Sequence, residues 1–89
     1  MEDSNPRLQR LMFEIVDNQL RSNDPPETRL TLDRLVREGH SDREAKRLIA
    51  VVVAVEIYDT LKHKVEFDRE RFITNLSRLP ALPFDNHDE

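Results

Sequence analysis

The sequence predicts an all-α protein, a compact irregular bundle of four helices around a long apolar third helix. Three observations support this prediction. Residues 41–61 have the pattern of a helix that is apolar on nearly every side. Three shorter segments, residues 5–21, 24–38 and 68–79, each carry one apolar stripe at helical spacing. Prolines, capping residues or a glycine separate the four segments, so we expect short links between neighbouring helices.

The length of the chain predicts one domain. Its 89 residues fit a single domain that buries roughly 60 to 65% of its unfolded surface, which predicts modest stability. We expect residues 5–84 to form this domain, with a flexible N-terminus over residues 1–4 and a flexible acidic C-terminus over residues 85–89.

Charge is evenly mixed over the body of the chain. The net charge of −4 comes from 14 basic and 18 acidic residues, but five acids lie in the two ends and leave 13 in residues 5–84. A near-neutral body has neither the basic surface that holds a phosphate backbone nor a polybasic patch for a membrane. We therefore expect neither a nucleic acid nor a membrane as the partner.

The composition also predicts the compartment. The chain has no cysteine, which is compatible with a reducing compartment. No secretory signal follows Met1, and the longest apolar run, residues 48–55, has eight residues, against about 20 for a membrane-spanning helix. We therefore expect a cytoplasmic protein without a membrane segment.

Asn5 and Pro6 mark the start of the first predicted helix. Asparagine accepts hydrogen bonds from free backbone N–H groups, and proline lacks the N–H group that would be unpaired at the first helical position. The apolar stripe consists of Leu8, Leu11, Met12, Ile15, Val16 and Leu20, with Phe13 beside it. Pro25 and Pro26 prevent this helix from continuing.

The sequence leaves two starts open for the second helix. Asp24 with Glu27 has the spacing of a capping pair, which places the start near Pro25, whereas Thr31 offers a later start. We expect Leu30, Leu35 and Val36 to be buried and Leu32 to be partly covered. Gly39, the only glycine, stands where the end of a helix needs a left-handed residue.

Ser41 and Glu44 form an S-x-x-E capping box at the start of the central helix. The β-branched residues in the run 51–57 also suit a buried strand, but each costs a helix only up to about 0.7 kcal/mol. The capping box, the lack of a breaker up to His63 and the spacing of the apolar residues favour a helix. These apolar residues are Ala45, Leu48, Ile49, Val52, Val53, Ile57 and Leu61.

Asp68 is the predicted cap of the fourth helix. Phe67 and Phe72 on either side of it have the spacing of a hydrophobic staple. The stripe of this helix consists of Phe72, Ile73, Leu76 and Leu79, and a proline follows directly. The sequence leaves open whether Leu82 and Phe84 pack back onto the body.

Four segments have recognisable sequences: VDNQL at residues 16–20, NDPPE at 23–27, TLDRLVREGHS at 31–41 and LSRLPALP at 76–83. Together they resemble a family of small uncharacterised bacterial proteins, a domain of unknown function. The resemblance spans nearly the whole body and implies a helical domain without an established activity. Longer relatives carry histidines near the start of the third helix. This chain has Arg43, Lys46 and Arg47 in those places, so the resemblance implies no metal site here.

Glu56, Asp59 and His63 share one face of the predicted central helix. Such a set binds a metal ion or moves protons only if ligands from another segment join it, although Asp59 can orient the imidazole of His63. We expect a solvated pair at a helix end instead. We therefore predict no catalytic residue, no metal and no other cofactor, and a metal-binding protein is the less favoured alternative.

The junction of the second and third helices has the outline of a helix-turn-helix motif, with Leu35, Gly39 and Ala45 at its key positions. Its would-be recognition helix opens with charges of mixed sign and then becomes too apolar to lie in a DNA groove. These features argue against a DNA-reading helix, so a nucleic-acid-binding protein is only the alternative to the main hypothesis.

The main hypothesis is a non-enzymatic module for protein–protein interaction or homodimerisation. Val51, Val55 and Tyr58 extend the apolar surface of the central helix beyond what three short helices cover, and exposed apolar surface marks a partner site. His40, in the link before this helix, is the fourth candidate for partner binding. We expect a second copy of the chain or another protein as the partner, and no small-molecule substrate.

Overall fold

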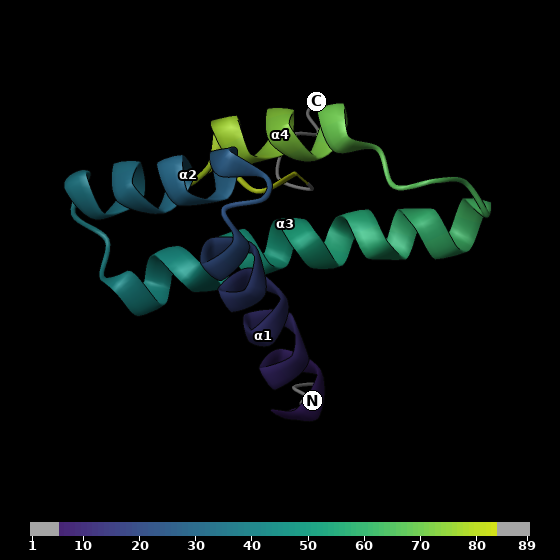
Figure 1. Cartoon of the computed structure of the whole chain (residues 1–89), viewed down its shortest axis with the longest axis horizontal. Helices are drawn as coiled ribbons and strands as arrows, with labels where there is room; N and C mark the ends of the chain where they lie inside the picture. The colour runs from purple at the N-terminus through teal and green to yellow at the C-terminus, as the bar shows by residue number, and fades with distance from the viewer. Residues whose placement is uncertain (1–5, 84–89) are drawn as a thin grey trace.

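Four α-helices make up the fold, and α3 runs through its middle (Figure 1). The computed structural model describes residues 6–83. The helices are α1 (Pro6–Ser22), α2 (Pro26–Arg37), α3 (Asp42–His63) and α4 (Arg69–Arg78), with no strand within residues 6–83. The radius of gyration is 12.9 Å, close to the value of about 12 Å for a compact domain of this length. The prediction of an all-α bundle is confirmed.

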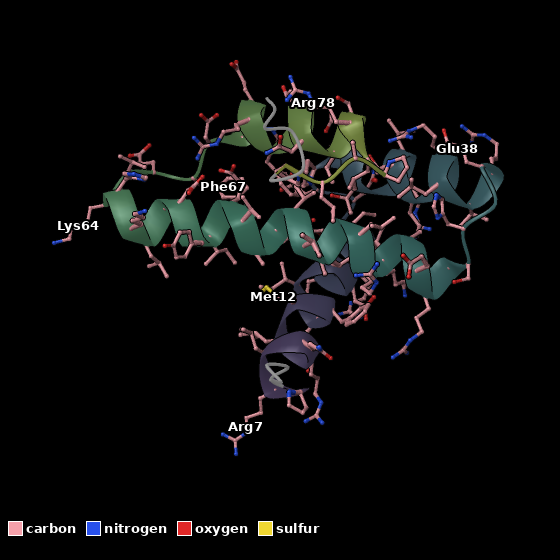
Figure 2. The ribbon with its side chains drawn as sticks, turned by 180° about the vertical axis from the view of Figure 1, so that it is seen from behind. Arg7, Met12, Glu38, Lys64, Phe67 and Arg78 are labelled. Atoms are coloured by element: carbon pink, nitrogen blue, oxygen red, sulfur yellow. The ribbon has the colours of Figure 1, made fainter. Side chains whose placement is uncertain are left out.

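The helices form two layers around α3. α2 and α4 lie along one side of α3, whereas α1 crosses the other side and points away from the body (Figures 1 and 2). None of the helices within residues 6–83 is both long and apolar enough to cross a membrane.

The core confirms that the valine-rich run is helical and central. Six of the twelve buried apolar residues come from α3. These six are Ala45, Leu48, Ile49, Ala50, Val52 and Val53. The other helices add Val16 of α1, Leu32 and Leu35 of α2, and Phe72 and Leu76 of α4, while Leu79 follows α4. Each short helix therefore covers part of α3 with its own apolar stripe.

The start of α2 decides between the two alternatives that the sequence left open. The helix begins at Pro26, with Pro25 as its cap residue and no capping side chain. The predicted capping pair of Asp24 with Glu27 is therefore wrong, because Asp24 stands one residue before the cap position. Its carboxylate lies 3.5 Å from the guanidinium of Arg69 instead.

The buried side of α2 differs from the prediction. Thr28, Thr31, Leu32 and Leu35, at steps of three and four residues, face the core, whereas Leu30 and Val36 are exposed. The burial predicted for Leu30 and Val36 is wrong because hydrophobicity suggested a different helix face. Thr28 tolerates full burial since its hydroxyl donates to Oε1 of Gln19 on α1 at 2.9 Å.

Gly39 ends α2 as predicted. Its φ of +110° lies in the left-handed region. The N–H of Gly39 donates to the carbonyl of Val36 at 3.0 Å, and the N–H of His40 donates to that of Leu35 at 3.1 Å. This pair of bonds is a Schellman motif, which reverses the chain and brings α3 back beside α2.

Half of the predicted capping box of α3 is formed. The Ser41 hydroxyl oxygen accepts from the N–H of Glu44 at 3.0 Å. The Glu44 carboxylate does not complete the box, because it accepts two bonds from Arg47, at 3.0 and 2.7 Å. A bidentate pair with a guanidinium is stronger than a single bond to a backbone N–H.

Both predicted start signals of α4 are confirmed. Asp68 accepts from the N–H of Arg71 at 3.0 Å, and the ring centroids of Phe67 and Phe72 lie 5.5 Å apart. Arg34 of α2 holds the other end of α4, where it donates to the carbonyls of Leu76 and Leu79 at 3.1 and 2.9 Å. The Leu76 carbonyl also accepts from the N–H of Leu79 at 3.2 Å, and the arginine adds a charged donor at this helix C-terminus.

The chain beyond α4 returns to the body. Leu82 is half-buried and packs against the core, which answers the question that the sequence left open for this residue. The predictions for Asn5, for Phe84 and for the two ends of the chain lie outside the described residues.

Replacing Val52 by aspartate is expected to abolish cooperative unfolding. Val52 is fully buried at the centre of α3, and an unpaired carboxylate there costs several kcal/mol, which is comparable to the whole stability of a small domain. Circular dichroism during heating measures the effect. Leu30→Asp is the control, because Leu30 is 64% exposed and its replacement should leave the melt nearly unchanged. A cooperative melt for V52D would contradict the core assignment.

Replacing Arg34 by methionine is expected to lower the free energy of unfolding by about 1.5 to 3 kcal/mol, because two carbonyls lose a charged donor. Urea denaturation gives the value. Arg37→Met is the matched control, since Arg37 is exposed on the same helix. Equal effects of the two substitutions would show that Arg34 does not cap α4.

Candidate functional site

The predicted partner-binding residues fall into two places. Val51 and Val55 are half-buried on α3, and Tyr58 is 61% exposed one and two turns further on. His40 lies before the opposite end of α3, in the link that follows α2. The structure therefore brings three of the four predicted residues together and leaves His40 apart from them.

One side of α3 is partly covered by α1 in its first half and stays open towards its C-terminus. The residues on this side recur at steps of three and four, which places them in one stripe. They are Arg43, Arg47, Ala50, Val51, Ala54, Tyr58 and Leu61. α1 crosses this stripe and covers only the part next to the crossing, as Figure 2 shows.

A groove of about 320 Å³ lies where α1 crosses the open side of α3. It is lined by Leu8, Gln9, Met12, Phe13, Arg43, Arg47, Ala50, Val51 and Ala54. Ala50 and Ala54 have small side chains and form the floor of the groove. Leu8, Met12 and Phe13 of α1 form an apolar wall. An apolar groove between helices of this size suits the side chains of a docked helix.

Arginines form the charged rim of this groove. The guanidinium of Arg43 lies 5.8 Å from the centre of the Phe13 ring, a cation–π contact. Arg47 is held by Glu44, and its hydrogen bond lowers the pKa of the Glu44 carboxyl group and raises that of its own guanidinium. The charges therefore sit at the edge and leave the floor apolar.

Two polar contacts fix α1 near its C-terminal half. Asp17 lies 3.1 Å from the ammonium group of Lys46 on α3, and Gln19 accepts from Thr28 of α2. The first three turns of α1 extend beyond these contacts. Leu8 and Leu11 of this part are 51 and 49% exposed.

The exposed ends of α1 and α3 are the part of the site that the sequence analysis missed. We predicted Leu8, Leu11 and Leu61 in buried stripes, and this is wrong, because Leu61 is 72% exposed and the other two are half-exposed. The difference in length between α3 and α2 indicates that the end of α3 is exposed. α3 has 22 residues and α2 has 12, so about 15 Å of α3 extends past its neighbour.

We call the apolar surface formed by both exposed ends and the groove the docking face. It consists of Leu8, Leu11 and Met12 of α1 and Val51, Ala54, Val55, Tyr58 and Leu61 of α3. Exposed apolar surface of this extent is typical of an interaction site.

The alternative metal site is not formed. Glu56 is fully buried, and its carboxylate accepts from Arg71 of α4 at 2.7 and 3.1 Å. Asp59 lies 3.7 Å from the same guanidinium. His63 approaches the backbone carbonyl of Asp59 at 3.3 Å and not its carboxylate, so the predicted orienting contact is wrong. No group of three metal-binding side chains occurs in the part of the chain that the structure describes.

The ion pair between the buried Glu56 and the exposed Arg71 has a structural role instead. The hydrogen bond to Glu56 raises the pKa of the Arg71 guanidinium, and Asp59 and Asp68 add to this effect. A buried carboxylate is stable only with such a partner. The pair therefore fixes α4 on α3.

The junction of α2 and α3 differs from a helix-turn-helix motif. The first turns of α3 are packed in the core through Ala45 and the residues that follow it on the same face, whereas the recognition helix of that motif is exposed so that it can lie in the major groove. This geometry does not favour the nucleic-acid-binding alternative.

Comparisons with known proteins leave the site to be interpreted from its own geometry. No protein-family model, curated protein or solved structure matches the chain. The resemblance to small bacterial helical proteins stays a prediction.

Replacing Arg71 by methionine is expected to lower the free energy of unfolding, because the buried carboxylate of Glu56 loses its charged partner. Urea denaturation measures the loss. The double variant Glu56→Gln with Arg71→Met should recover part of it, since the buried group is then neutral. An unchanged stability in R71M would contradict a structural role for the pair.

Proposed function

We propose that this domain is a non-enzymatic protein-interaction module whose docking face holds an amphipathic helix of a partner chain. One observation carries the proposal. Tyr58 and Leu61, two of the most exposed large apolar residues, continue the same stripe of α3 that forms the floor of the groove. A monomeric protein rarely keeps such a continuous apolar surface without a partner.

The shape of the docking face supports a helix as the bound element. The apolar stripe follows the axis of α3, and α1 adds a second apolar wall at an angle to it. The small side chain of Ala54 lets another helix approach closely. A helix laid into a groove between two helices contacts it with side chains at steps of three and four residues.

The energetics agree with this interpretation. Full burial of a large apolar side chain contributes about 1.5 to 3 kcal/mol, so Tyr58 and Leu61 alone provide a substantial driving force for docking. The rim arginines add selectivity for partners with acidic residues beside their apolar ones, because complementary charge steers association.

Site-specific photo-crosslinking in the native cells tests the proposal. Tyr58 or Leu61 is replaced by benzoylphenylalanine, and illumination is expected to give a discrete covalent adduct. Mass spectrometry should place the attachment in an amphipathic helical segment of a partner. Leu30 is the matched control, because it is equally exposed but lies on α2. Adducts that are absent at both positions, or equally frequent at Leu30, would refute the proposal.

A further inference from the structure

We infer that the helix held by the docking face is α1 of a second copy of this chain, so that two copies form a symmetric dimer in which each docking face binds α1 of the other copy. This inference rests on the proposed function, and it names the partner. Three observations carry it: the shape of the two exposed helix ends, the spacing between them and the area that they leave uncovered.

Two exposed helix ends project from the body of one copy: the N-terminal half of α1 and the C-terminal turns of α3. The first half of α1 points away from α3, and the last turns of α3 extend past α2 (Figures 1 and 2). From the crossing, where Met12 lies beside Ala50, the exposed part of α1 back to Pro6 is about 9 Å long, and the part of α3 up to His63 is about 20 Å long. The two exposed helix ends form a V-shaped apolar surface. A second copy related by a two-fold rotation presents the same surface, so the two surfaces can pack against each other, as a symmetric interface requires.

The spacing of exposed residues on α3 matches this arrangement. α1 of the same copy crosses α3 beside Ala50 and Val51, since both line the groove with Met12. A second α1 packed next to the first lies about 8 to 10 Å away, which is about five to seven residues along α3. Tyr58, which is 61% exposed, lies seven residues after Val51, at the far end of this range. In the proposed dimer, Leu8 of one copy lies beside Tyr58 of the other, and the two-fold symmetry repeats this contact.

The chain itself provides the required ligand. α1 is an amphipathic helix whose apolar stripe continues past the crossing to Leu11 and Leu8, which are about half exposed. The docking face needs an amphipathic helix, and α1 needs an apolar surface. Both requirements are met when a second copy binds.

The uncovered area is that of a stable dimer interface. Leu8, Leu11, Tyr58 and Leu61 are 51, 49, 61 and 72% exposed. At about 200 Å² for a large apolar side chain, they leave roughly 450 Å² of apolar surface per copy. A standard interface buries about 800 Å² per partner and is about 65% apolar in homodimers, which is about 500 Å².

Sedimentation equilibrium of the purified full chain is the first test. We expect a dimer at micromolar concentration, and Tyr58→Glu is expected to raise the dimer dissociation constant by about 30-fold or more, because two charges enter the interface. Leu30→Glu is the control and should leave the dimer intact. A wild-type chain that stays monomeric at millimolar concentration overturns the inference, while a photo-adduct with a different protein would leave the proposed function standing.

Cysteine cross-linking is the second test, and it uses the lack of natural cysteines. A chain with Leu8→Cys is mixed with a chain carrying Tyr58→Cys, so that a disulfide between these positions forms only between copies. We expect the mixed dimer under mild oxidation, and none when Leu30→Cys replaces Leu8→Cys. A wild-type dimer without the link between positions 8 and 58 overturns this symmetric dimer and leaves the proposed function intact.

Discussion

The need to cover α3 governs the whole structure. This helix is apolar on nearly every side, and the chain has only three short helices with which to shield it from water. α2 and α4 lie along one side and α1 crosses the other. Because a crossing helix covers only the region around its contact, the same side of α3 remains open on the way to its C-terminus. The docking face is therefore a direct consequence of how a small domain buries a long apolar helix.

Polar contacts determine where each short helix sits on α3. Arg71 pairs with the buried Glu56 and fixes α4, while Arg34 joins α2 to the end of α4. Asp17 and Gln19 hold α1 by its C-terminal half. Apolar packing alone allows helices to slide along one another, whereas an ion pair with a buried carboxylate or a capped helix end has one good geometry. These contacts therefore decide that the N-terminal half of α1 projects.

The distribution of charge separates the structural part of the molecule from the interacting part. The Glu56–Arg71 pair and the Arg34 cap lie between α2, α3 and α4, whereas the groove of the docking face is bordered by Arg43 and Arg47, and Lys62 lies 5.6 Å from the Tyr58 ring. An interface with an apolar centre and a polar edge resembles a protein–protein contact more than a catalytic site. The rim arginines are themselves held by Phe13 and Glu44, so they present a defined edge to an incoming helix.

Local signals in the sequence were enough to predict most of the helix boundaries. Gly39, Ser41, Asp68 and the staple of Phe67 with Phe72 act on residues within one turn, so their effect does not depend on the rest of the fold. The same holds for the central helix, where apolar residues at helical spacing outweighed a modest β-branched penalty. Val51, Val55 and Tyr58 were predicted as surface beyond the core stripe for the same reason.

Only the tertiary structure decided which stripes are covered. Leu30 and Val36 are more apolar than Thr28, yet Thr28 is buried because Oε1 of Gln19 on another helix accepts a hydrogen bond from its hydroxyl group. Glu56 has no predictive signal in its own segment, since its partner lies 15 residues away on α4. The exposure of Leu8, Leu11 and Leu61 depends on where helices cross and how far they extend. Helix periodicity specifies a face, but the position of a neighbouring helix specifies whether that face meets water.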